Sequence, residues 1–520
     1  MRLTQLLYKL GSACIHTQFC FAFATIGKTP KFTVTYIVKD IYYISERQQQ
    51  YFMSDLTQLK TIGELRAAGY HTKTVKEEMR ENLVKKLKEG SALFPGIVGY
   101  DDTVIPQIEN ALLSGQDIVL LGERGQAKTR LARSLVHFLD EYVPAIAGCE
   151  INDDPFHPIC KACQVRIAED GDTTPIIWLS RSQRYSEKLA TPDITISDLI
   201  GEIDPIKVAE GRYLSDELTI HYGLIPRTHR GIFCLNELPD LTERIQVGLL
   251  NILEERDVQI RGYKIQLPLD IFMVASANPE DYTNRGRIIT PLKDRMGSEI
   301  RTHYPQTLEE EILIIDSEAV HPIIDGIEIM YPQYMKEIVA EITHQARKSS
   351  EISQKSGVSV RVSITNAENV ASNAVRRALR NNEKRAVPRI SDLNSVIAST
   401  AGKIELDTFG EVREDKIVGK LIHSSIIHVF ARYFDVSEFD QLLAGFEKGL
   451  HVQVSENQKS MDYVSQLAQI GGLRAAVDKL SAHGAPETVA AAVEFILEGL
   501  HLNRKLNKNT AGGSVNYQKK

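Results

Sequence analysis

A short loop between an apolar run and a helical pattern is the feature that most constrains this chain. Residues 122–129 read Gly-Glu-Arg-Gly-Gln-Ala-Lys-Thr, after the apolar run 117–121 and before apolar residues that recur at helical spacing from Leu131 to Leu139. A glycine-containing loop between a buried parallel strand and a helix directs backbone N–H groups and the helix N-terminus at an anion. The pattern predicts a nucleoside triphosphate site. The alternative is a strand, turn and helix without a ligand.

Within this loop, each residue type has a predicted task. Lys128 adds a positive charge for the β- and γ-phosphates, and the Thr129 hydroxyl is suited to ligate Mg²⁺. Ala127 stands where a second glycine is usual, so we expect the loop to form with weaker phosphate contact. The predicted nucleotide-binding residues here are Gly122, Glu123, Arg124, Gly125, Gln126, Ala127, Lys128, Thr129 and Arg130.

The remaining chain predicts a parallel α/β domain followed by helices. Besides 117–121, the apolar runs 174–180, 231–235 and 270–276 are predicted strands, and helical patterns separate them. Such alternation implies a parallel sheet with helices on both faces. Residues 257–267 alternate about Arg261-Gly262 and predict an inserted hairpin. Helical patterns fill residues 60–89 and the chain beyond Tyr304, and the Gly-, Asn- and Lys-rich tail 507–520 is predicted to be disordered.

Polar residues follow two of the predicted strands. Glu237 is placed to orient and deprotonate an attacking water, and Asn236 to hold a Mg²⁺-bound water through its neutral carbonyl. The alternative for this pair is a helix N-cap after a strand. Asn278 ends the next strand, where an amide contacts both the γ-phosphate and the water; a turn-initiating Asn-Pro is the alternative.

Two arginines complete the constellation. Arg295 is placed to reach the γ-phosphate of a neighbouring subunit, where a guanidinium stabilises the charge of the transferring phosphoryl group. Arg361 begins a helical region and is the second candidate. Taken singly, each would be interpreted as a solvated surface residue.

Together these motifs resemble the AAA+ superfamily, and within it the group of MoxR and the magnesium-chelatase ATPase subunit. The motifs that carry the resemblance are 94–99, the phosphate loop, 198–205, Gly223-Leu-Ile-Pro226 with Gly231, Asn236-Glu-Leu, Ala277-Asn-Pro279, Asp294-Arg295 and Ser359-Val-Arg361. The resemblance implies Glu237 as catalytic base, Asn278 as first sensor, Arg295 as finger and Arg361 as second sensor. It also implies that Val98 and Gly99 lie near the adenine.

The resemblance implies a domain order as well. Helices at 53–93 precede an AAA+ α/β domain at 94–305 with an insertion at about 149–163, a helical lid at 306–405 and a helical C-terminal region at 406–506. Residues 1–52 are interpreted as a mis-assigned start or a disordered extension, against a secretory leader suggested faintly by Ala22-Phe-Ala24.

The insertion contains a candidate metal site. Cys149, His157, Cys160 and Cys163 offer four ligands that suit tetrahedral structural Zn²⁺. The alternatives are a reduced cysteine pair with an exposed histidine, or a redox Cys-x-x-Cys, which is disfavoured because no strand leads directly into it.

Composition limits the partners. A formal charge of −7 and a single Trp argue against generic nucleic-acid binding, and no run approaches the roughly 20 apolar residues that cross a bilayer. Six cysteines fit a reducing compartment, and an ATP-driven machine points to the cytoplasm.

Three functions are consistent with the sequence. The first is a ring of six subunits that couples Mg-ATP hydrolysis to remodelling of a partner, for which the resemblance implies a protein with a von Willebrand A domain and, as the namesake activity, assistance to metal insertion. The second, motivated by Ala127 and Asn236, is a nucleotide-dependent switch or scaffold with weak hydrolysis. A transcription activator is the third, disfavoured by the acidic balance and the lack of a Gly-Ala-Phe-Thr-Gly-Ala loop.

Overall fold

The computed structural model describes residues 56–209, 217–255, 257–259, 266–279, 286–354, 356–406, 413–455, 457–467, 472–480, 484–511 and 514–519. The predicted leader 1–52 and the Arg261-Gly262 turn lie outside these residues. The chain divides into two compact units: Met1–His71 with Arg166–Trp178, and Thr72–Val165 with Leu179–Lys520.

The smaller unit is built around helix α3, Ile62–Ala67. Thr61 caps this helix, and its hydroxyl accepts a hydrogen bond from the Glu64 N–H at 3.3 Å. Trp178 donates its ring N–H to the Leu59 carbonyl at 3.0 Å and meets the Tyr70 ring edge-on, with centroids 6.2 Å apart. These contacts fix the start of the described chain to the segment around Trp178.

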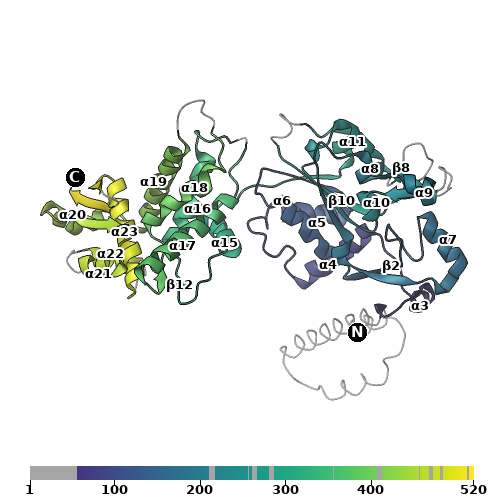
Figure 1. Cartoon of the computed structure of the whole chain (residues 1–520), viewed down its shortest axis with the longest axis horizontal. Helices are drawn as coiled ribbons and strands as arrows, with labels where there is room; N and C mark the ends of the chain where they lie inside the picture. The colour runs from purple at the N-terminus through teal and green to yellow at the C-terminus, as the bar shows by residue number, and fades with distance from the viewer. Residues whose placement is uncertain are drawn as a thin grey trace, which may run out of the picture. The chain divides into compact units, whose positions relative to one another are not determined.

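A five-stranded parallel sheet organises the larger unit (Figure 1). Its strand order is β11-β1-β10-β7-β4. The strands are β1 (Ile118–Leu121), β4 (Tyr185–Leu189), β7 (Gly231–Asn236), β10 (Ile271–Ala277) and β11 (Ser298–Arg301). All residues of β1, β7 and β10 are buried, as expected for strands covered on both faces.

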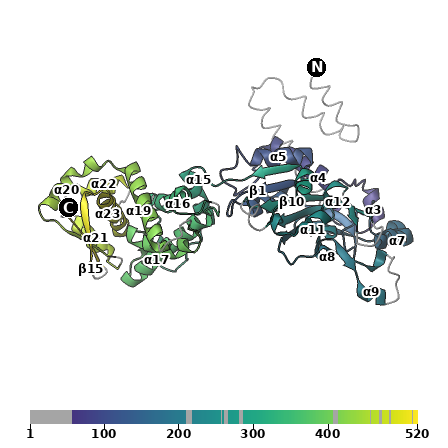
Figure 2. The same ribbon diagram turned by 90° about the horizontal axis from the view of Figure 1, so that it is seen from above.

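Helices cover both faces of this sheet (Figure 2). On one side lie α4 (Val75–Glu89) and α5 (Ile105–Ser114), whose apolar residues share one core with β1, β7 and β10. A capping box between Thr74 and Glu77 starts α4, and Gly90 ends it in the left-handed conformation. On the other side lies α11 (Glu243–Gly248). The predicted parallel α/β sheet is confirmed.

The sequence analysis misassigned the strands at one edge. Three predicted strands are β1, β7 and β10, but Ile176–Ser180 (β3) is not among the five strands of this sheet. The edge position belongs instead to β4, whose Tyr-Ser-Glu-Lys-Leu sequence has no continuous apolar run. An edge strand needs less burial than a central strand, and this is why its signal was missed.

Shorter helices and strands connect the strands of this sheet. The predicted hairpin exists: β8 (Asp257–Gln259) pairs antiparallel with β9 (Gln266–Pro268). The other elements are α6 (Lys128–Ser134), β2 (Tyr142–Ile146), α7 (Lys161–Asp170), α8 (Ile196–Leu199), β5 (Gly201–Ile203), α9 (Pro205–Ala209), β6 (Ile220–Tyr222), α10 (Leu224–Arg227), α12 (Leu250–Glu254) and α14 (Thr290–Arg295).

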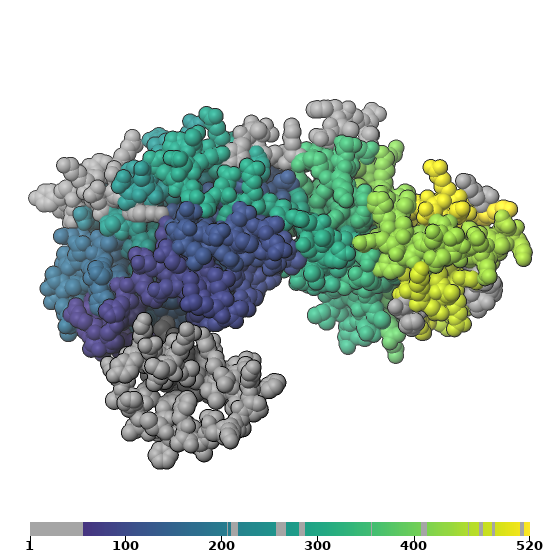
Figure 3. All heavy atoms as spheres, turned by 180° about the vertical axis from the view of Figure 1, so that it is seen from behind, coloured from purple at the N-terminus to yellow at the C-terminus, as the bar shows by residue number. Residues whose placement is uncertain are grey.

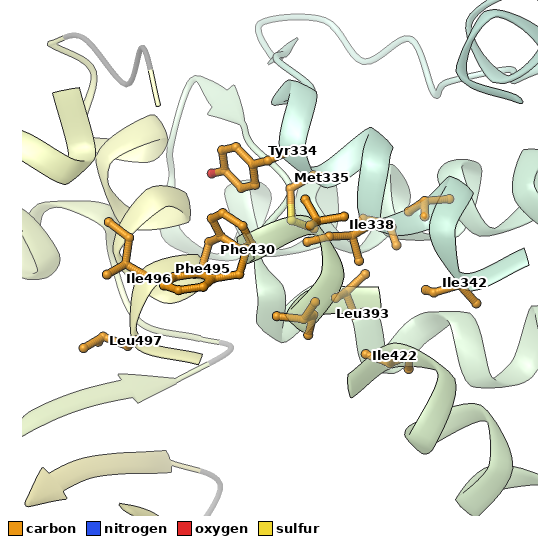
Figure 4. Packing of buried hydrophobic residues seen from close by; sticks show 14 of the residues in the cluster. Tyr334, Met335, Ile338, Ile342, Leu393, Ile422, Phe430, Phe495, Ile496 and Leu497 are labelled. Atoms are coloured by element: carbon orange, nitrogen blue, oxygen red, sulfur yellow. The ribbon is translucent and has the colours of Figure 1, made fainter. Parts of the chain in front are cut away.

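Helices dominate the chain after β11. They are α15 (Leu308–Glu318), α16 (Gln333–Lys348), α17 (Arg361–Asn381), α18 (Val396–Ala401), α19 (Glu414–Tyr433), α20 (Asp440–Glu447), α21 (Ser460–Leu467), α22 (Leu473–Lys479) and α23 (Pro486–Leu502), with short parallel strands β12 (Glu328–Ile329) and β13 (Arg385–Ala386). One apolar cluster runs through α16, α19 and α23 (Figure 4). Within it the Tyr334 and Phe495 rings stack with centroids 4.6 Å apart.

The prediction of a disordered tail is wrong. Residues Leu506–Ala511 (β15) and Ser514–Lys519 (β16) form a hairpin, and β16 also pairs with β14 (Val452–Ser455). The tail lies against the last helices, as the yellow spheres of Figure 3 show. Tyr517 is buried and its hydroxyl bonds Glu498 of α23, which also accepts from Lys508 at 2.8 Å. Composition concealed two anchoring residues, Leu506 and Tyr517, whose side chains are buried.

None of the helices among the described residues is both long and apolar enough to cross a membrane.

Two helical glycines provide a test of this core. A methyl group at Gly499 of α23 would overlap the Phe430 ring, so we expect Gly499→Ala to lower the free energy of unfolding by about 1–3 kcal/mol. Gly419 of α19 has no heavy atom within 4 Å of an added Cβ, so Gly419→Ala should raise it by about 0.5–1 kcal/mol. Urea unfolding followed by circular dichroism measures both; shifts of the same sign would contradict the packing.

Candidate functional site

The predicted phosphate loop connects β1 to α6. Gly125 has φ of 76°, and Ala127 lies in the left-handed region with φ 54° and ψ 16°. An alanine there carries strain of about 1–2 kcal/mol that glycine would avoid. Helix α6 begins at Lys128, directly after this turn, so its first N–H groups face the loop. The loop therefore keeps a phosphate-binding conformation despite Ala127.

Lys128 is buried beneath the loop. Its ammonium donates to the carbonyls of Gly122 and Glu123, the latter at 3.0 Å, and to Asn278 Oδ1 at 2.7 Å. These hydrogen bonds fix the ammonium at the N-terminus of α6, beside the loop. This arrangement suits an anion at the loop.

Two buried side chains brace the loop from behind. Gln126 Oε1 accepts from the Glu123 N–H at 3.0 Å and from the Thr302 hydroxyl at 2.8 Å. The Tyr100 hydroxyl lies 2.9 Å from the Gln126 carbonyl, and burial raises the pKa of Tyr100 to about 12. These contacts tie the loop to β11 and to the entry turn before α5.

A cavity of about 760 Å³ opens beside the loop. It is lined by ten of the predicted residues: Val98, Arg124, Gly125, Gln126, Ala127, Lys128, Thr129, Arg130, Glu237 and Arg361. Gly122 and Glu123 line a second hollow of about 360 Å³ with Arg301 and Thr302. The volume of the first cavity is suited to a nucleotide. Its described lining does not include Gly99, Asn236, Asn278 or Arg295.

The carboxyl ends of β7 and β10 bring the predicted catalytic residues together. Asn278 donates its amide N–H to Glu237 Oε2 at 2.9 Å and accepts from Lys128 through its oxygen. Glu237 has φ 55° and ψ 49°, a left-handed conformation that is rare for a residue with a side chain. Its N–H donates to the Ser276 hydroxyl at 3.2 Å. Lys128, Asn278 and Glu237 therefore form one hydrogen-bonded chain beside the loop.

Asn236 has a different environment from the one predicted for a Mg²⁺ ligand. Its amide nitrogen donates to Glu187 Oε1 at 2.7 Å, and its oxygen accepts from the Ser276 hydroxyl at 3.1 Å. Glu187 receives a bidentate pair from Arg133 at 2.8 and 3.0 Å, and this guanidinium lowers the pKa of Glu187. A second carboxylate, besides that of Glu237, therefore lies at this edge on β4, and Arg133 balances its charge.

The predicted second arginine lies at the cavity on the helical side. Arg361 begins α17, and its N–H donates to the Ser359 hydroxyl at 3.1 Å. A Cβ at Gly125 would overlap Ser359, so glycine is what allows the α17 segment to approach the loop. The Tyr304 hydroxyl donates to the Arg124 carbonyl at 2.8 Å, and the Arg347 guanidinium stacks 4.3 Å from the Tyr304 ring centre.

Arg295 is held away from the cavity. It lies at the end of α14, where its Nε donates to Glu254 Oε2 at 2.6 Å and one Nη donates to the Pro291 carbonyl at 2.9 Å. Its side chain is 26% exposed. Arg130 of α6, another of the predicted nucleotide-binding residues, forms an ion pair with Glu318 of α15.

The structure brings together three of the four predicted zinc ligands and leaves His157 out, so the prediction for His157 is wrong. The His157 side chain is 80% exposed, while Asp153 takes its place in a cluster with Cys149, Cys160 and Cys163. His157 instead lies near Asp154, which accepts its N–H at 3.2 Å. A histidine two residues after a turn-forming Asp-Pro points away from the loop interior, and this geometry is not readable from spacing alone.

Sequence reasoning missed Arg133, Glu187 and Ser276. Arg133 is four residues after Thr129 and so shares its helix face, a signal that was present in the sequence. Ser276 lies two residues before Asn278 in β10 and shares its face. Glu187 required recognition of β4, which has no apolar run.

Comparisons with known proteins show what the chain is similar to. A model described as the Sigma-54 interaction domain matches residues 209–296. A chloroplast magnesium-chelatase ChlI subunit of Arabidopsis thaliana is 27% identical over 233 residues, which is 44% of this chain and 51% of that protein. A ChlI subunit of Chlorella vulgaris is 28% identical over 220 residues, covering 41% and 58%. The chain thus spans about half the length of the curated relatives it matches.

Solved structures also match. A BchI–BchD complex of magnesium chelatase matches with 16% identity and a TM-score of 0.33, covering 62% of this chain and 98% of the matched chain. NtrX of Brucella abortus matches with 16% identity and a TM-score of 0.36, covering 67% and 66%.

The parallel sheet with its phosphate loop and polar strand ends has the predicted AAA+ fold. The chain is similar to magnesium-chelatase ChlI subunits over less than half of its length. The resemblance to the magnesium-chelatase ATPase subunit is confirmed, and the resemblance to MoxR stays a prediction.

The hydrogen bond between Asn236 and Glu187 can be tested by exchanging the amide and the carboxylate between the two positions. Asn236→Asp removes the amide donor and places two carboxylates together, so we expect a loss of about 1–3 kcal/mol in the free energy of unfolding. Adding Glu187→Gln restores one amide and one carboxylate, and the coupling between the two changes should be about 0.5–3 kcal/mol. Urea unfolding of both single variants and the double variant measures this coupling. Additive losses would contradict the contact.

Proposed function

We propose that this chain hydrolyses Mg-ATP as one subunit of a ring and uses that reaction to remodel a partner protein. The observation that carries the proposal is the hydrogen-bonded chain Lys128–Asn278–Glu237 at the edge of the phosphate loop. It joins an anion-binding group, a γ-phosphate contact and a carboxylate suited to activate water. Thr129, on the first turn of α6, supplies the hydroxyl for Mg²⁺.

Arg295 supports the proposal of a ring. The cavity beside the loop is lined by Arg361 of the same chain, whereas Arg295 is paired with Glu254 at the end of α12. In a ring, Arg295 would exchange Glu254 for the γ-phosphate of an adjoining subunit. Closed rings are the usual product of such head-to-tail contacts, and we propose six subunits.

The partner and the setting are proposed as well. Similarity to magnesium-chelatase subunits supports assistance to metal insertion as the process. The partner with a von Willebrand A domain is proposed from the motif resemblance alone. The inserted hairpin of β8 and β9 and the segment from α8 to α9 are the elements we assign to contact with that partner. The need for ATP supports a cytoplasmic location.

A switch with weak hydrolysis is the second candidate. The left-handed Ala127 and the engagement of Asn236 by Glu187 and Ser276 favour it, because both depart from a strongly Mg²⁺-binding site. Steady-state turnover at saturating Mg-ATP separates the candidates. Tight ATP binding with no turnover in the wild type would support the switch.

The catalytic base gives a direct prediction. Glu237→Gln keeps the hydrogen bond from Asn278 and removes the base, so ATP should still bind while steady-state hydrolysis is lost. Calorimetry measures binding, and phosphate release measures turnover. Retention of wild-type turnover by Glu237→Gln would exclude this residue as the base.

The proposed contact of Arg295 with the nucleotide of a neighbouring subunit gives a second prediction. Arg295→Ala should leave ATP binding intact and lower turnover by about 10³-fold, as for other arginine fingers. Arg385→Ala is the matched control, because Arg385 is exposed, pairs with Glu328 at 3.2 Å and lines neither cavity beside the loop.

Mixing the two inactive variants tests the geometry further. An interface between Arg295→Ala and Glu237→Gln subunits combines an intact base from one chain with an intact finger from the other. Mixed rings should therefore recover part of the turnover. No recovery in rings shown to be mixed would mean that Arg295 acts within its own subunit.

A further inference from the structure

Three thiols and one carboxylate converge in the insertion that follows β2. The sulfur atoms of Cys149, Cys160 and Cys163 and a carboxylate oxygen of Asp153 all lie within 4.8 Å of one another. The Cys149 and Cys160 sulfurs are 4.0 Å apart. Tetrahedral zinc with Zn–S bonds of about 2.3 Å places its sulfur ligands about 3.8 Å apart. A disulfide needs about 2.05 Å, so the two thiols are not bonded to each other, and their spacing is close to that of sulfur ligands on one ion.

Backbone N–H groups are directed at these sulfurs. The N–H groups of Ile151 and Asp153 donate to Cys149 Sγ at 3.4 and 3.3 Å, and the Cys163 N–H donates to Cys160 Sγ at 3.4 Å. Such hydrogen bonds stabilise negative charge on sulfur, and the thiolate is the form that binds metals. The loop conformation therefore prepares the cysteines as ligands.

Asp153 is fixed in the same way. Its side chain is fully buried, and its two oxygens accept from the Ile159 N–H at 3.2 Å and the Cys160 N–H at 2.9 Å. Each carboxylate oxygen keeps a further lone pair for an ion. A buried carboxylate next to three cysteines is costly unless a cation balances its charge.

We propose that Cys149, Asp153, Cys160 and Cys163 bind one structural Zn²⁺. Four protein ligands close the coordination sphere, which is the pattern of a structural rather than a catalytic zinc site. Thiolates select zinc over Mg²⁺ or Ca²⁺, which take oxygen ligands.

The ion would fix the insertion to the rest of the domain. Cys149 follows β2, and Cys163 lies in the first turn of α7, so coordination connects the two ends of a turn-rich loop. Asn152 in this loop donates to the Arg227 carbonyl of α10 at 3.1 Å, and Asp154 lies 3.9 Å from Arg230. Zinc therefore holds the loop against the segment that leads into β7 and Glu237.

Metal analysis of the full chain tests the site. Protein expressed with zinc in the medium and purified without chelators should contain about one zinc per chain. Cys160→Ser should reduce this below about 0.2 per chain, and Asp153→Asn should weaken zinc retention against a chelator. Cys234→Ala and His157→Ala are the controls, and both should keep about one zinc per chain.

Cobalt provides a readout that does not depend on variants. Wild-type protein reconstituted with Co²⁺ should show intense thiolate-to-cobalt absorption and the visible bands of a tetrahedral ion. Wild-type protein with less than about 0.2 zinc per chain would overturn the proposal, as would iron in place of zinc. Loss of zinc from His157→Ala would overturn the ligand set with Asp153.

Discussion

The parallel alignment of β1, β7 and β10 is the constraint on which the candidate site depends. Because their carboxyl ends meet at one edge, the loop after β1, Glu237 after β7 and Asn278 after β10 lie within hydrogen-bond reach of one another. The buried ammonium of Lys128 then connects the loop to Asn278. The polar residues at the strand ends help to fix the register, because Asn236 of β7 and Ser276 of β10 are hydrogen-bonded to each other.

The two carboxylates at that edge lie on different strands and not next to each other in the sequence. Glu237 carries one carboxylate at the tip of β7, and the second belongs to Glu187 on β4, where Arg133 neutralises it. Ser276 accepts from Glu237 and donates to Asn236, so one hydroxyl couples the strained backbone to the amide. The site thus combines preorganised polar contacts with low net negative charge.

Sequence reasoning was most effective where local chemistry repeats a known geometry. The loop 122–129, Glu237 and Asn278 were identified because strand, turn and polar residue follow in a fixed order. Glu187 was missed because its partners lie on other elements far along the chain, and the contact exists only after the sheet assembles. The prediction of a disordered tail failed for the same reason. The residues around Tyr517 are polar and suggested disorder, whereas Tyr517 is buried only because it packs against α23. His157 was chosen by residue type, whereas the turn geometry selected Asp153.

The apolar cluster through α16, α19 and α23 has a mechanical consequence. Because the Tyr334 and Phe495 rings belong to one core, α16 and α23 cannot separate without exposing that core to water. Arg361 begins α17, and Val362 and Val370 of this helix belong to the same cluster. A shift of Arg361 on exchange of nucleotide would therefore strain packing that extends as far along the chain as Tyr517.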